Sequence, residues 1–222
     1  MMCFDPRIRL PKIFTRFFPD AFWRGSSDEK MLFLTFDDGP IPEVTPWVLD
    51  LLKKENISAC FFCVGENVKW NPQVFRQIVD SGHLVGNHTY HHVQGLKVSD
   101  EEYRKNIEET DNLIHSRFFR PPHGLMKRSQ YKWLRDRYNI IMWDLVSCDY
   151  RGDWEPSRII HNVTNYVRPG SIITFHDSLK AEKNLRQSLP VVIKELKKRG
   201  YSFGNLDQLA DRFCKKRIKN IT

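Results

Sequence analysis

The sequence lacks a long hydrophobic run, a disulfide framework and a nucleic-acid-binding motif. No apolar stretch approaches the roughly 20 residues that a transmembrane helix needs. The five cysteines are odd in number and show no framework spacing, which argues against a disulfide scaffold. Despite a formal net charge of +8, the 222-residue chain has no arginine-rich arm, helix-turn-helix pattern or zinc-finger spacing, so we expect no nucleic-acid partner. The length and ordinary composition predict one soluble globular domain, which we expect to be a monomer.

A signal-peptide pattern is also missing from the start of the sequence. Charged residues and a proline interrupt its would-be apolar region at residues 5–9, so we expect a cytoplasmic protein. Residues 7–24 mix basic side chains with aromatic and aliphatic ones, and Pro11 and Pro19 break any helical regularity. We expect this segment to be a strap packed over the bottom of the fold. Weak contact of residues 7–24 with the inner membrane surface is the alternative.

Strand-like and helix-like segments alternate along the chain. An apolar run predicts a strand, and apolar residues at helical spacing predict a helix. We expect strands at residues 31–36, 58–64, 83–86, 117–120, 139–143, 171–175 and 201–203. We expect helices at residues 46–54, 71–82, 99–115, 129–138, 156–167, 189–199 and from 205. This alternation predicts an α/β fold with about seven parallel strands and helices outside them, open or rolled into a barrel.

Cys60 and Cys63 have the spacing of a redox or metal motif, but they lie inside the apolar run of residues 59–64. Residues three apart on a strand point to opposite faces, so these two thiols could not share an ion. We predict that both are buried strand cysteines without a metal or redox role.

Two adjacent carboxylates, Asp37 and Asp38, follow the strand expected at residues 31–36 and precede a Gly-Pro turn. Like charges side by side repel, and burying them is costly unless a metal or another cation neutralises one. The pair therefore predicts one carboxylate on a metal and one free to move protons.

Three histidines, His88, His91 and His92, fall within five residues just after the strand expected at residues 83–86. Residues four apart share a helical face, so His88 and His92 can offer both imidazoles to one ion, with His91 as the rival ligand. Two imidazoles and one carboxylate, with positions left open to water, are typical of a hydrolytic zinc site.

Further polar groups follow other expected strands. Arg120 can reach a carboxylate of the site and hold it ionised, and two prolines fix the turn after it, which places the next amide nitrogens as an oxyanion hole requires. His176 follows the strand at residues 171–175 and is a candidate acid for a leaving amine. Asp149 is a candidate to orient it, after a strand expected to end at Trp143.

These candidates share one position in the expected fold, at or just past the carboxyl end of a strand. In α/β barrels all such ends open on one face, where active sites are built. We therefore expect seven residues to converge there: Asp37, Asp38, His88, His92, Arg120, Asp149 and His176.

In these residues the chain resembles the polysaccharide deacetylases, the family with the NodB homology domain (carbohydrate esterase family 4). Residues 35–39, 88–92, 120–124 and 175–177 resemble four motifs of that family in order, and the resemblance runs from about residue 31 to 206. It implies a single-domain, NodB-like distorted (β/α) barrel. The expected organisation is an N-terminal strap (residues 1–30), the barrel (residues 31–210) and a basic tail (residues 211–222).

The resemblance also implies roles for the matching residues. Asp37 would be the catalytic base, while Asp38, His88 and His92 would bind one divalent metal ion, leaving His91 out. Zn²⁺ is the expected ion, with Co²⁺, Ni²⁺ and Mn²⁺ as alternatives.

Arg120 would pair with the base, the amide of His123 would stabilise the oxyanion, and His176, supported by Asp149, would be the general acid. Position 123 is histidine where the family usually has an aromatic residue, commonly tyrosine. In the fourth motif, usually Asp-x-x-Asp-Trp, Val146 replaces the first aspartate and Tyr150 the tryptophan, which changes the expected acetyl pocket.

The predicted function is a metal-dependent hydrolase that removes N-acetyl groups from an N-acetylated amino sugar or polysaccharide and releases acetate. An O-acetyl esterase on the same scaffold and a non-catalytic carbohydrate-binding relative are the nearest alternatives. A mononuclear iron oxygenase also uses two histidines and one carboxylate but needs neither the base nor the acid. A membrane-attached scaffold that uses residues 7–24 is the remaining alternative.

Overall fold

The computed structural model describes residues 8–9, 12–26 and 28–210. The strands of this part are β1 (Met31–Asp37), β2 (Cys60–Cys63), β3 (Leu84–Asn87), β4 (Phe118–Phe119), β5 (Asn139–Ile140), β6 (Leu145–Val146), β7 (Ile172–His176) and β8 (Ser202–Gly204). Its α-helices are α1 (Thr45–Glu55), α2 (Gly65–Trp70), α3 (Pro72–Asp80), α4 (Asp100–Ile114), α5 (Arg128–Leu134), α6 (Pro156–Tyr166) and α7 (Glu182–Lys198). Its 3-10 helices are η1 (Lys12–Arg16), η2 (Gly95–Lys97) and η3 (Pro122–Gly124).

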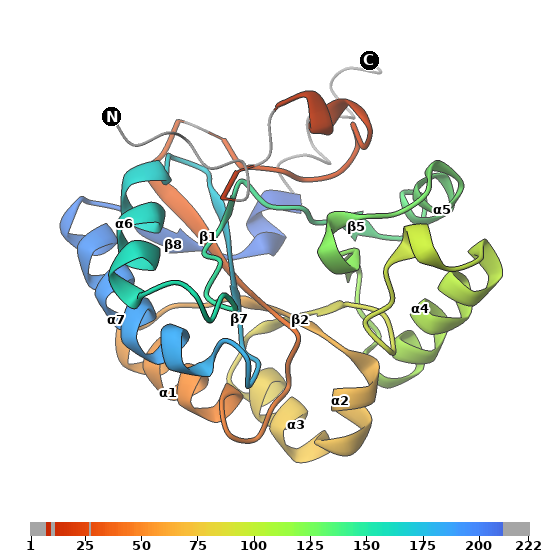
Figure 1. Ribbon diagram of the computed structural model, residues 1–222, viewed down its shortest axis with the longest axis horizontal. Helices are drawn as coiled ribbons and strands as arrows, with labels where there is room; N and C mark the ends of the chain where they lie inside the picture. The colour runs from red at the N-terminus through yellow and green to blue at the C-terminus, as the bar shows by residue number, and fades with distance from the viewer. Residues whose placement is uncertain (1–7, 10–11, 27, 211–222) are drawn as a thin grey trace.

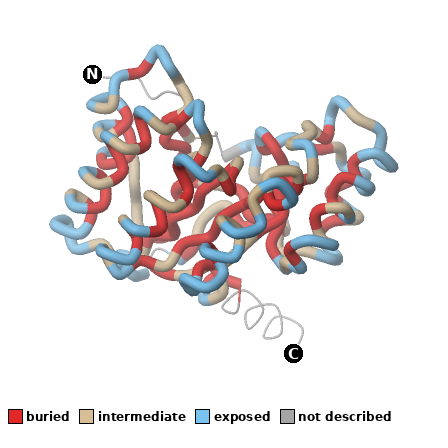
Figure 2. Tube along the Cα trace, turned by 90° about the horizontal axis from the view of Figure 1, so that it is seen from below, coloured by how far each residue is buried: buried red, intermediate tan, exposed pale blue. Residues whose placement is uncertain are grey.

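The strands form one sheet in the order β5-β4-β3-β2-β1-β7-β6, and β8 pairs with the start of β1. Every strand pairing in it is parallel. The sheet curls into a half-barrel, and the helices α6, α7, α1, α3, α2 and α4 form an arc outside it (Figure 1). Buried residues concentrate in the central strands, and exposed ones line the outer sides of the helices (Figure 2). The predicted α/β barrel class is confirmed.

Strand alternation divides the core into two layers. Leu34 and Phe36 of β1 pack with the outer helices in the largest apolar cluster, whereas Phe33 faces the inside of the curl. Cys60 lies in the inner cluster and Cys63 in the outer one, and both are buried free thiols. The prediction that these cysteines point to opposite faces is therefore confirmed.

The inner face changes character along its length. At the amino ends of the strands it is apolar, with Phe22, Phe33 and Ile172 in one cluster. Towards the carboxyl ends, the inward positions of β1 continue as Thr35 and Asp37, because side chains on one face recur every second residue. The inside of the half-barrel is therefore filled by apolar side chains at the amino ends of the strands and carries polar side chains at their carboxyl ends.

The N-terminal segment contacts the edges of the sheet. The carbonyl of Ile8 accepts a hydrogen bond from Val146 N, and Phe22 forms a parallel bridge with Ile141. On η1 and just after it, Ile13 and Phe17 are exposed. The strap and the three segment boundaries stay predictions, since residues 1–7 and the tail at 211–222 lie outside the described residues. Within the described part, no helix is both long and apolar enough to span a bilayer.

Three local expectations were wrong or incomplete. The helix α2 was not expected, because a six-residue helix with two buried positions offers too little periodicity to detect. Helix α7 begins at Glu182 and not at residue 189, since the buried stripe that includes Leu185 extends it on the amino side of Pro190. The strand before Asp149 is β6 and not a strand ending at Trp143.

Candidate active site

A cavity of about 390 Å³ opens at the carboxyl ends of the central strands. Most of the predicted site residues line it: Asp37, Asp38, His88, His92, His123, Tyr150 and His176. Arg120 and Asp149 are fully buried behind them. The structure therefore brings together side chains that are up to 139 residues apart in the chain (Asp37 and His176).

Asp38, His88 and His92 form a three-residue cluster with the geometry of a metal site. Their potential ligand atoms all lie within 4.8 Å of one another. The Asp38 Oδ1 lies 3.3 Å from His92 Nε2 and 3.8 Å from His88 Nε2. Ligands about 2 Å from a tetrahedral ion lie roughly 3.3 Å apart, so this donor set fits a divalent ion such as zinc.

The two histidines meet through a loop, which overturns the expectation of a shared helical face. Residues 88–92 are not helical, and Thr89 and His92 have left-handed backbone conformations (φ 63° and 52°). Side chains satisfy the loop backbone: Asn87 Oδ1 accepts from Thr89 N, and Asn106 Oδ1 accepts from His91 N. These hydrogen bonds, one to a neighbouring residue and one to helix α4, take the place of those of a helix.

His91 stays outside the cluster. Its ring is half-exposed and its Nδ1 lies 3.4 Å from the Glu66 carboxylate. The sequence alone left His91 as a rival ligand, and its place in the structure matches the family motif, which leaves it out.

The unexpected helix α2 holds both ligand-bearing loops. Its first two amides, Gly65 N and Glu66 N, donate to the carbonyls of Thr89 and Tyr90. Its Asn67 Nδ2 donates to the carbonyl of Asp38 over 2.7 Å. A Cβ at position 65 would meet Tyr90 of the histidine loop at 2.7 Å and Thr110 Oγ1 of α4 at 2.5 Å, so only glycine fits at the start of this helix.

Protonation states in the cluster suit metal binding. Burial lowers the pKa of His88 to about 4, against the opposing pull of Asp37, so the ring is neutral near pH 7. Its Nδ1 lies 2.8 Å from the carbonyl of Arg120, which leaves Nε2 directed at the cluster. Burial alone would raise the pKa of Asp38, but the surrounding imidazoles, His176 first, hold it below its usual value. A neutral imidazole and an ionised carboxylate are the forms that bind an ion.

Arg120 holds the buried side chain of Asp37 in place. Its Nη1 donates to Asp37 Oδ1 over 2.6 Å and to Thr35 Oγ1 over 2.9 Å. Its remaining nitrogens donate to the carbonyls of Ile141 and Met142, each over 3.1 Å. The guanidinium is thus held on three sides, and Asp37 Oδ2, 3.9 Å from His88 Nε2, stays free on the cavity side.

His176 lies beside Asp37, because the two residues are register partners on the neighbouring strands β7 and β1. Its Nδ1 is 2.7 Å from Asp149 Oδ1, and its backbone N donates to Asp149 Oδ2. Burial by itself would lower the pKa of His176, but Asp149 and the more distant Asp38 and Asp37 outweigh it and raise it to about 9. The imidazole is therefore protonated at neutral pH and can act as an acid.

Left-handed backbone conformations concentrate around the cavity. Among the described non-glycine residues with positive φ, five lie in its loops: Asp38, Thr89, His92, His123 and Cys148. The other two, Asn56 and His115, are helix C-caps, where such a conformation is ordinary. Strain of this kind persists where surrounding contacts fix a functional geometry.

His123 and Tyr150 both line the cavity. The His123 ring packs edge-on against His92, with centroids 4.9 Å apart, and its backbone turns at φ 59° within η3. The Tyr150 ring packs edge-on against His176, with centroids 4.8 Å apart. Burial raises the pKa of Tyr150 to about 12, so its hydroxyl stays neutral.

Sequence reasoning missed several residues of this region. Thr174 and Lys180 line the cavity, and Thr174 could have been found because it lies two residues before His176 on one strand face. Asp177 is fully buried and accepts from Gly39 N (3.2 Å) and Thr45 Oγ1 (2.6 Å). It thereby fixes the turn after Asp38, and a Cβ at position 39 would meet its Oδ2 at 2.0 Å.

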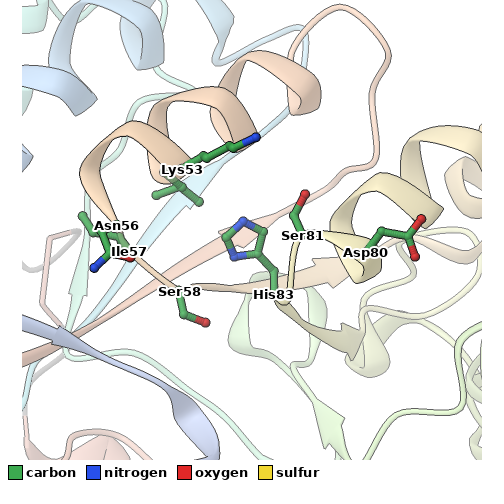
Figure 3. A pocket seen from close by; sticks show the side chains of 8 residues that line it. Lys53, Asn56, Ile57, Ser58, Asp80, Ser81 and His83 are labelled. Carbon is green, nitrogen blue, oxygen red and sulfur yellow. The ribbon is translucent and has the colours of Figure 1, made fainter.

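A second cavity, of about 420 Å³, lies at the amino ends of β2 and β3. His83 forms part of its floor, and its Nδ1 accepts from Ala59 N. Around it, the side chains of Asn56, Ser58 and Asp80 point in different directions and do not converge on a common point (Figure 3). The cavity of about 420 Å³ therefore lacks the converging carboxylates and imidazoles that line the cavity of about 390 Å³.

Comparisons with known proteins agree with this geometry. The profile of the polysaccharide deacetylase family matches residues 24–136. A peptidoglycan-N-acetylglucosamine deacetylase of Bacillus cereus is 34% identical over 193 residues, covering 83% of this chain and 70% of the relative. The peptidoglycan-N-acetylmuramic acid deacetylase PdaA of Bacillus subtilis is 32% identical, covering 86% of this chain and 75% of the relative.

Solved structures also resemble this chain. The crystal structure of the Bc1960 peptidoglycan N-acetylglucosamine deacetylase superposes with a TM-score of 0.83 at 32% identity, covering 90% of this chain and 96% of that one. The half-barrel with its candidate metal-ligand cluster, together with these relatives, places the chain among the hydrolases that act on amide bonds outside peptides. The chain belongs to the polysaccharide deacetylase family, carbohydrate esterase family 4, and the predicted resemblance is confirmed.

Proposed function

We propose that this protein removes N-acetyl groups from the amino sugars of peptidoglycan, with Asp37 as base, His176 as acid and one Zn²⁺ bound by Asp38, His88 and His92. One observation carries the proposal. Asp37, hydrogen-bonded to Arg120, and His176, hydrogen-bonded to Asp149, are neighbours in register beside the metal-ligand cluster. Two relatives that act on peptidoglycan amino sugars support the choice of substrate.

Each group has one task in the reaction. A divalent ion at the cluster supplies a Lewis acid and lowers the pKa of bound water. Asp37 accepts the proton of the attacking water at Oδ2, since Arg120 occupies Oδ1. The His123 amide donates to the acetyl oxygen as it becomes negative.

As the carbon–nitrogen bond breaks, His176 gives its proton to the leaving nitrogen from Nε2, because Nδ1 is held by Asp149. The products are acetate and the free amino sugar. Tyr150, beside His176, forms the wall that the sugar contacts. The need for a protonated acid favours an amide substrate, whose amine leaves poorly without a proton.

The test is acetate release by the purified full chain from peptidoglycan glycan strands, N-acetylglucosamine oligomers and an O-acetylated xylan. We expect release from the N-acetylated substrates, loss of release after chelation and recovery on addition of Zn²⁺. Co²⁺, Ni²⁺ and Mn²⁺, added separately, compare the metals. Release from the xylan alone would replace this proposal with the O-acetyl esterase, and sugar binding without any release would replace it with a binding protein.

A matched pair of variants separates the metal site from its surroundings. His92→Ala removes a proposed ligand, whereas His91→Ala removes a neighbouring half-exposed imidazole. We expect Zn²⁺ binding and acetate release to fall only in His92→Ala. Equal losses in both variants would contradict the ligand assignment.

The cytoplasmic location expected from the sequence stays a prediction. In that location, nucleotide-linked or lipid-linked N-acetyl sugars would replace assembled peptidoglycan as the natural substrate. Cell fractionation, together with an assay on these precursors, tests the location and the substrate form at once.

A further inference from the structure

Three large apolar side chains are exposed together in the N-terminal segment. Ile13, Phe14 and Phe17, on η1 and just after it, are 51%, 40% and 51% exposed, and the ring centroids of the two phenylalanines lie 6.2 Å apart. These three residues form the exposed apolar cluster. The other exposed large hydrophobic side chains of the described residues lie singly on separate elements. Clustered exposure of this kind marks an interaction surface, whereas isolated exposed side chains are ordinary.

The segment that carries the cluster is attached to the half-barrel on both sides of it. Before the cluster, the carbonyl of Ile8 accepts a hydrogen bond from Val146 N. After it, Phe18 packs on Tyr131 of α5 with ring centroids 5.1 Å apart, and Asp20 N donates to the Tyr131 hydroxyl over 2.7 Å. The short helix η1, drawn in red, lies on the open side of the half-barrel, across from the arc of outer helices (Figure 1). These attachments hold the cluster at the surface.

Exposed cations lie beside the cluster. Arg16 belongs to η1 itself. Arg128 and Lys132 are exposed on α5, the helix that this segment contacts, and residues four apart share one helical face. The next cation along the chain, Arg135, is paired with Asp20 over 3.4 Å. With a formal net charge of +8 on the whole chain, this side of the molecule complements an anionic surface.

A lipid surface fits this combination better than a protein partner does. A stable protein–protein interface buries about 800 Å² on each partner, which three half-exposed side chains cannot supply. A bilayer requires only shallow insertion, about 5–10 Å into the boundary between headgroups and acyl chains. Basic side chains next to the inserted residues then interact with anionic headgroups.

We propose that the exposed apolar cluster is a docking site for an anionic lipid bilayer, with Ile13, Phe14 and Phe17 inserted at the headgroup level and Arg16 and Lys132 in contact with anionic headgroups. Docking of this kind is reversible, because a single short turn enters the bilayer and no chain crosses it. The inference is independent of the proposed function, since no residue of the cluster lines the active-site cavity.

The apolar part is tested by co-sedimentation of the full chain with vesicles of phosphatidylcholine mixed with phosphatidylglycerol. Phe14→Ser with Phe17→Ser removes two inserted rings, whereas Val79→Ser with Val191→Ser replaces two apolar residues of similar exposure (47% and 42%) on other helices. We expect the first pair to lower the partition coefficient by roughly 10- to 50-fold, because both rings lose burial in lipid. The control pair should change it by less than about twofold.

The charged part is tested with the same vesicles and with phosphatidylcholine alone. Arg16→Gln with Lys132→Gln should lower the partition coefficient by roughly 5- to 25-fold on the anionic vesicles and leave the weaker binding to phosphatidylcholine unchanged. Lys194→Gln with Lys198→Gln, two exposed lysines of α7, is the matched control and should bind like wild type. Rising salt should weaken wild-type binding and reduce the difference between the pairs.

A wild type that does not sediment with the anionic vesicles, or equal losses in the cluster variants and their controls, would overturn the inference. Light scattering adds a second check. A dimer that Phe14→Ser with Phe17→Ser dissociates, without vesicle binding, would make the cluster a contact between copies of the chain and refute lipid docking. Circular dichroism verifies that each variant is folded. Because partition is measured without turnover, vesicle binding by a protein that releases no acetate would support lipid docking while the proposed function fails.

Discussion

The two ends of the half-barrel are made of the same strands but have opposite chemistry. At the amino ends, inward side chains such as Phe33 and Ile172 pack together, and among the described non-glycine residues of the loops only the two helix caps Asn56 and His115 have a positive φ. At the carboxyl ends, the same strand faces carry Thr35, Asp37 and His176, and the loops adopt left-handed conformations. The apolar end holds the strands in register, and this register places the base beside the acid.

Removal of the proposed base, Asp37 at the polar end, should have the largest effect on catalysis. Asp37→Asn should lower kcat for acetate release by roughly 10²- to 10⁴-fold, because no other described group faces the attacking water as a proton acceptor. The fold should persist, since Arg120 keeps its hydrogen bonds to Thr35, Ile141 and Met142. Kinetics with circular dichroism check both parts. Rates within threefold of wild type would remove Asp37 from the mechanism.

Substitution of Thr45, which supports the turn after Asp38 through Asp177, should have a smaller and indirect effect on metal binding. Thr45→Val removes the hydroxyl that donates to Asp177 but keeps the side-chain shape, and Thr45→Ser keeps the hydroxyl. We expect Thr45→Val to weaken Zn²⁺ binding by roughly tenfold, as for other groups that support a ligand. Thr45→Ser should bind like wild type. Titration with a competing chelator measures the difference, and equal affinities for the two variants would show that Asp177 does not position the turn.

The raised pKa of His176, the proposed general acid, predicts how kcat/KM depends on pH. Because the pKa of His176 is raised to about 9 and its protonated form is the active one, kcat/KM should fall as pH rises through about 9. Asp149→Asn removes the charge that raises this pKa, so the falling limb should move to lower pH. Rate profiles for both proteins, normalised to their maxima, measure the shift. An alkaline limb that does not move would mean that another group limits the rate.

A substitution at the amino end of the half-barrel should lower the stability of the protein and leave catalysis unchanged. Phe33→Ala leaves a cavity in the inner apolar cluster and should reduce the free energy of unfolding by about 3–5 kcal/mol. The value of kcat/KM per folded molecule should change by less than about threefold. Denaturant titration and active-site-normalised kinetics separate these effects, and a large loss of kcat in the fully folded variant would show that the two ends are coupled.

Lys53→Ala, on the rim of the larger cavity at the amino end, should have the smallest effect. Because its side chain is exposed and the neighbouring polar groups do not converge, we expect less than a twofold change in kcat/KM and a change in stability below about 0.5 kcal/mol. A marked loss of activity would mean that this cavity also serves the reaction.

The sequence was informative where local rules operate and less so where distant contacts decide. Buried apolar runs and helix starts, such as Ser99 capping α4 through Glu102 N, could be recognised directly. The convergence of Asp37 and His176 could be predicted because strand ends in this class of fold share one face.

What escaped prediction depends on contacts between segments far apart in the sequence. The loop at residues 88–92 has a helix-like spacing, but hydrogen bonds from its backbone amides to the side-chain oxygens of Asn87 and Asn106 hold it in another conformation. Helix α2 is too short to show a period, and Asp177 gains its role only when Gly39 and Thr45 are brought next to it.

The most direct test of the account is acetate release from peptidoglycan glycan strands by the metal-free protein as Zn²⁺ is added back. The account predicts no release before addition, a rise that saturates near one ion per chain, and no rise in His92→Ala. Full release from the metal-free protein, or a saturating ion that restores activity equally in His92→Ala, would contradict the claim that the polar end of the half-barrel is a metal-dependent deacetylase site.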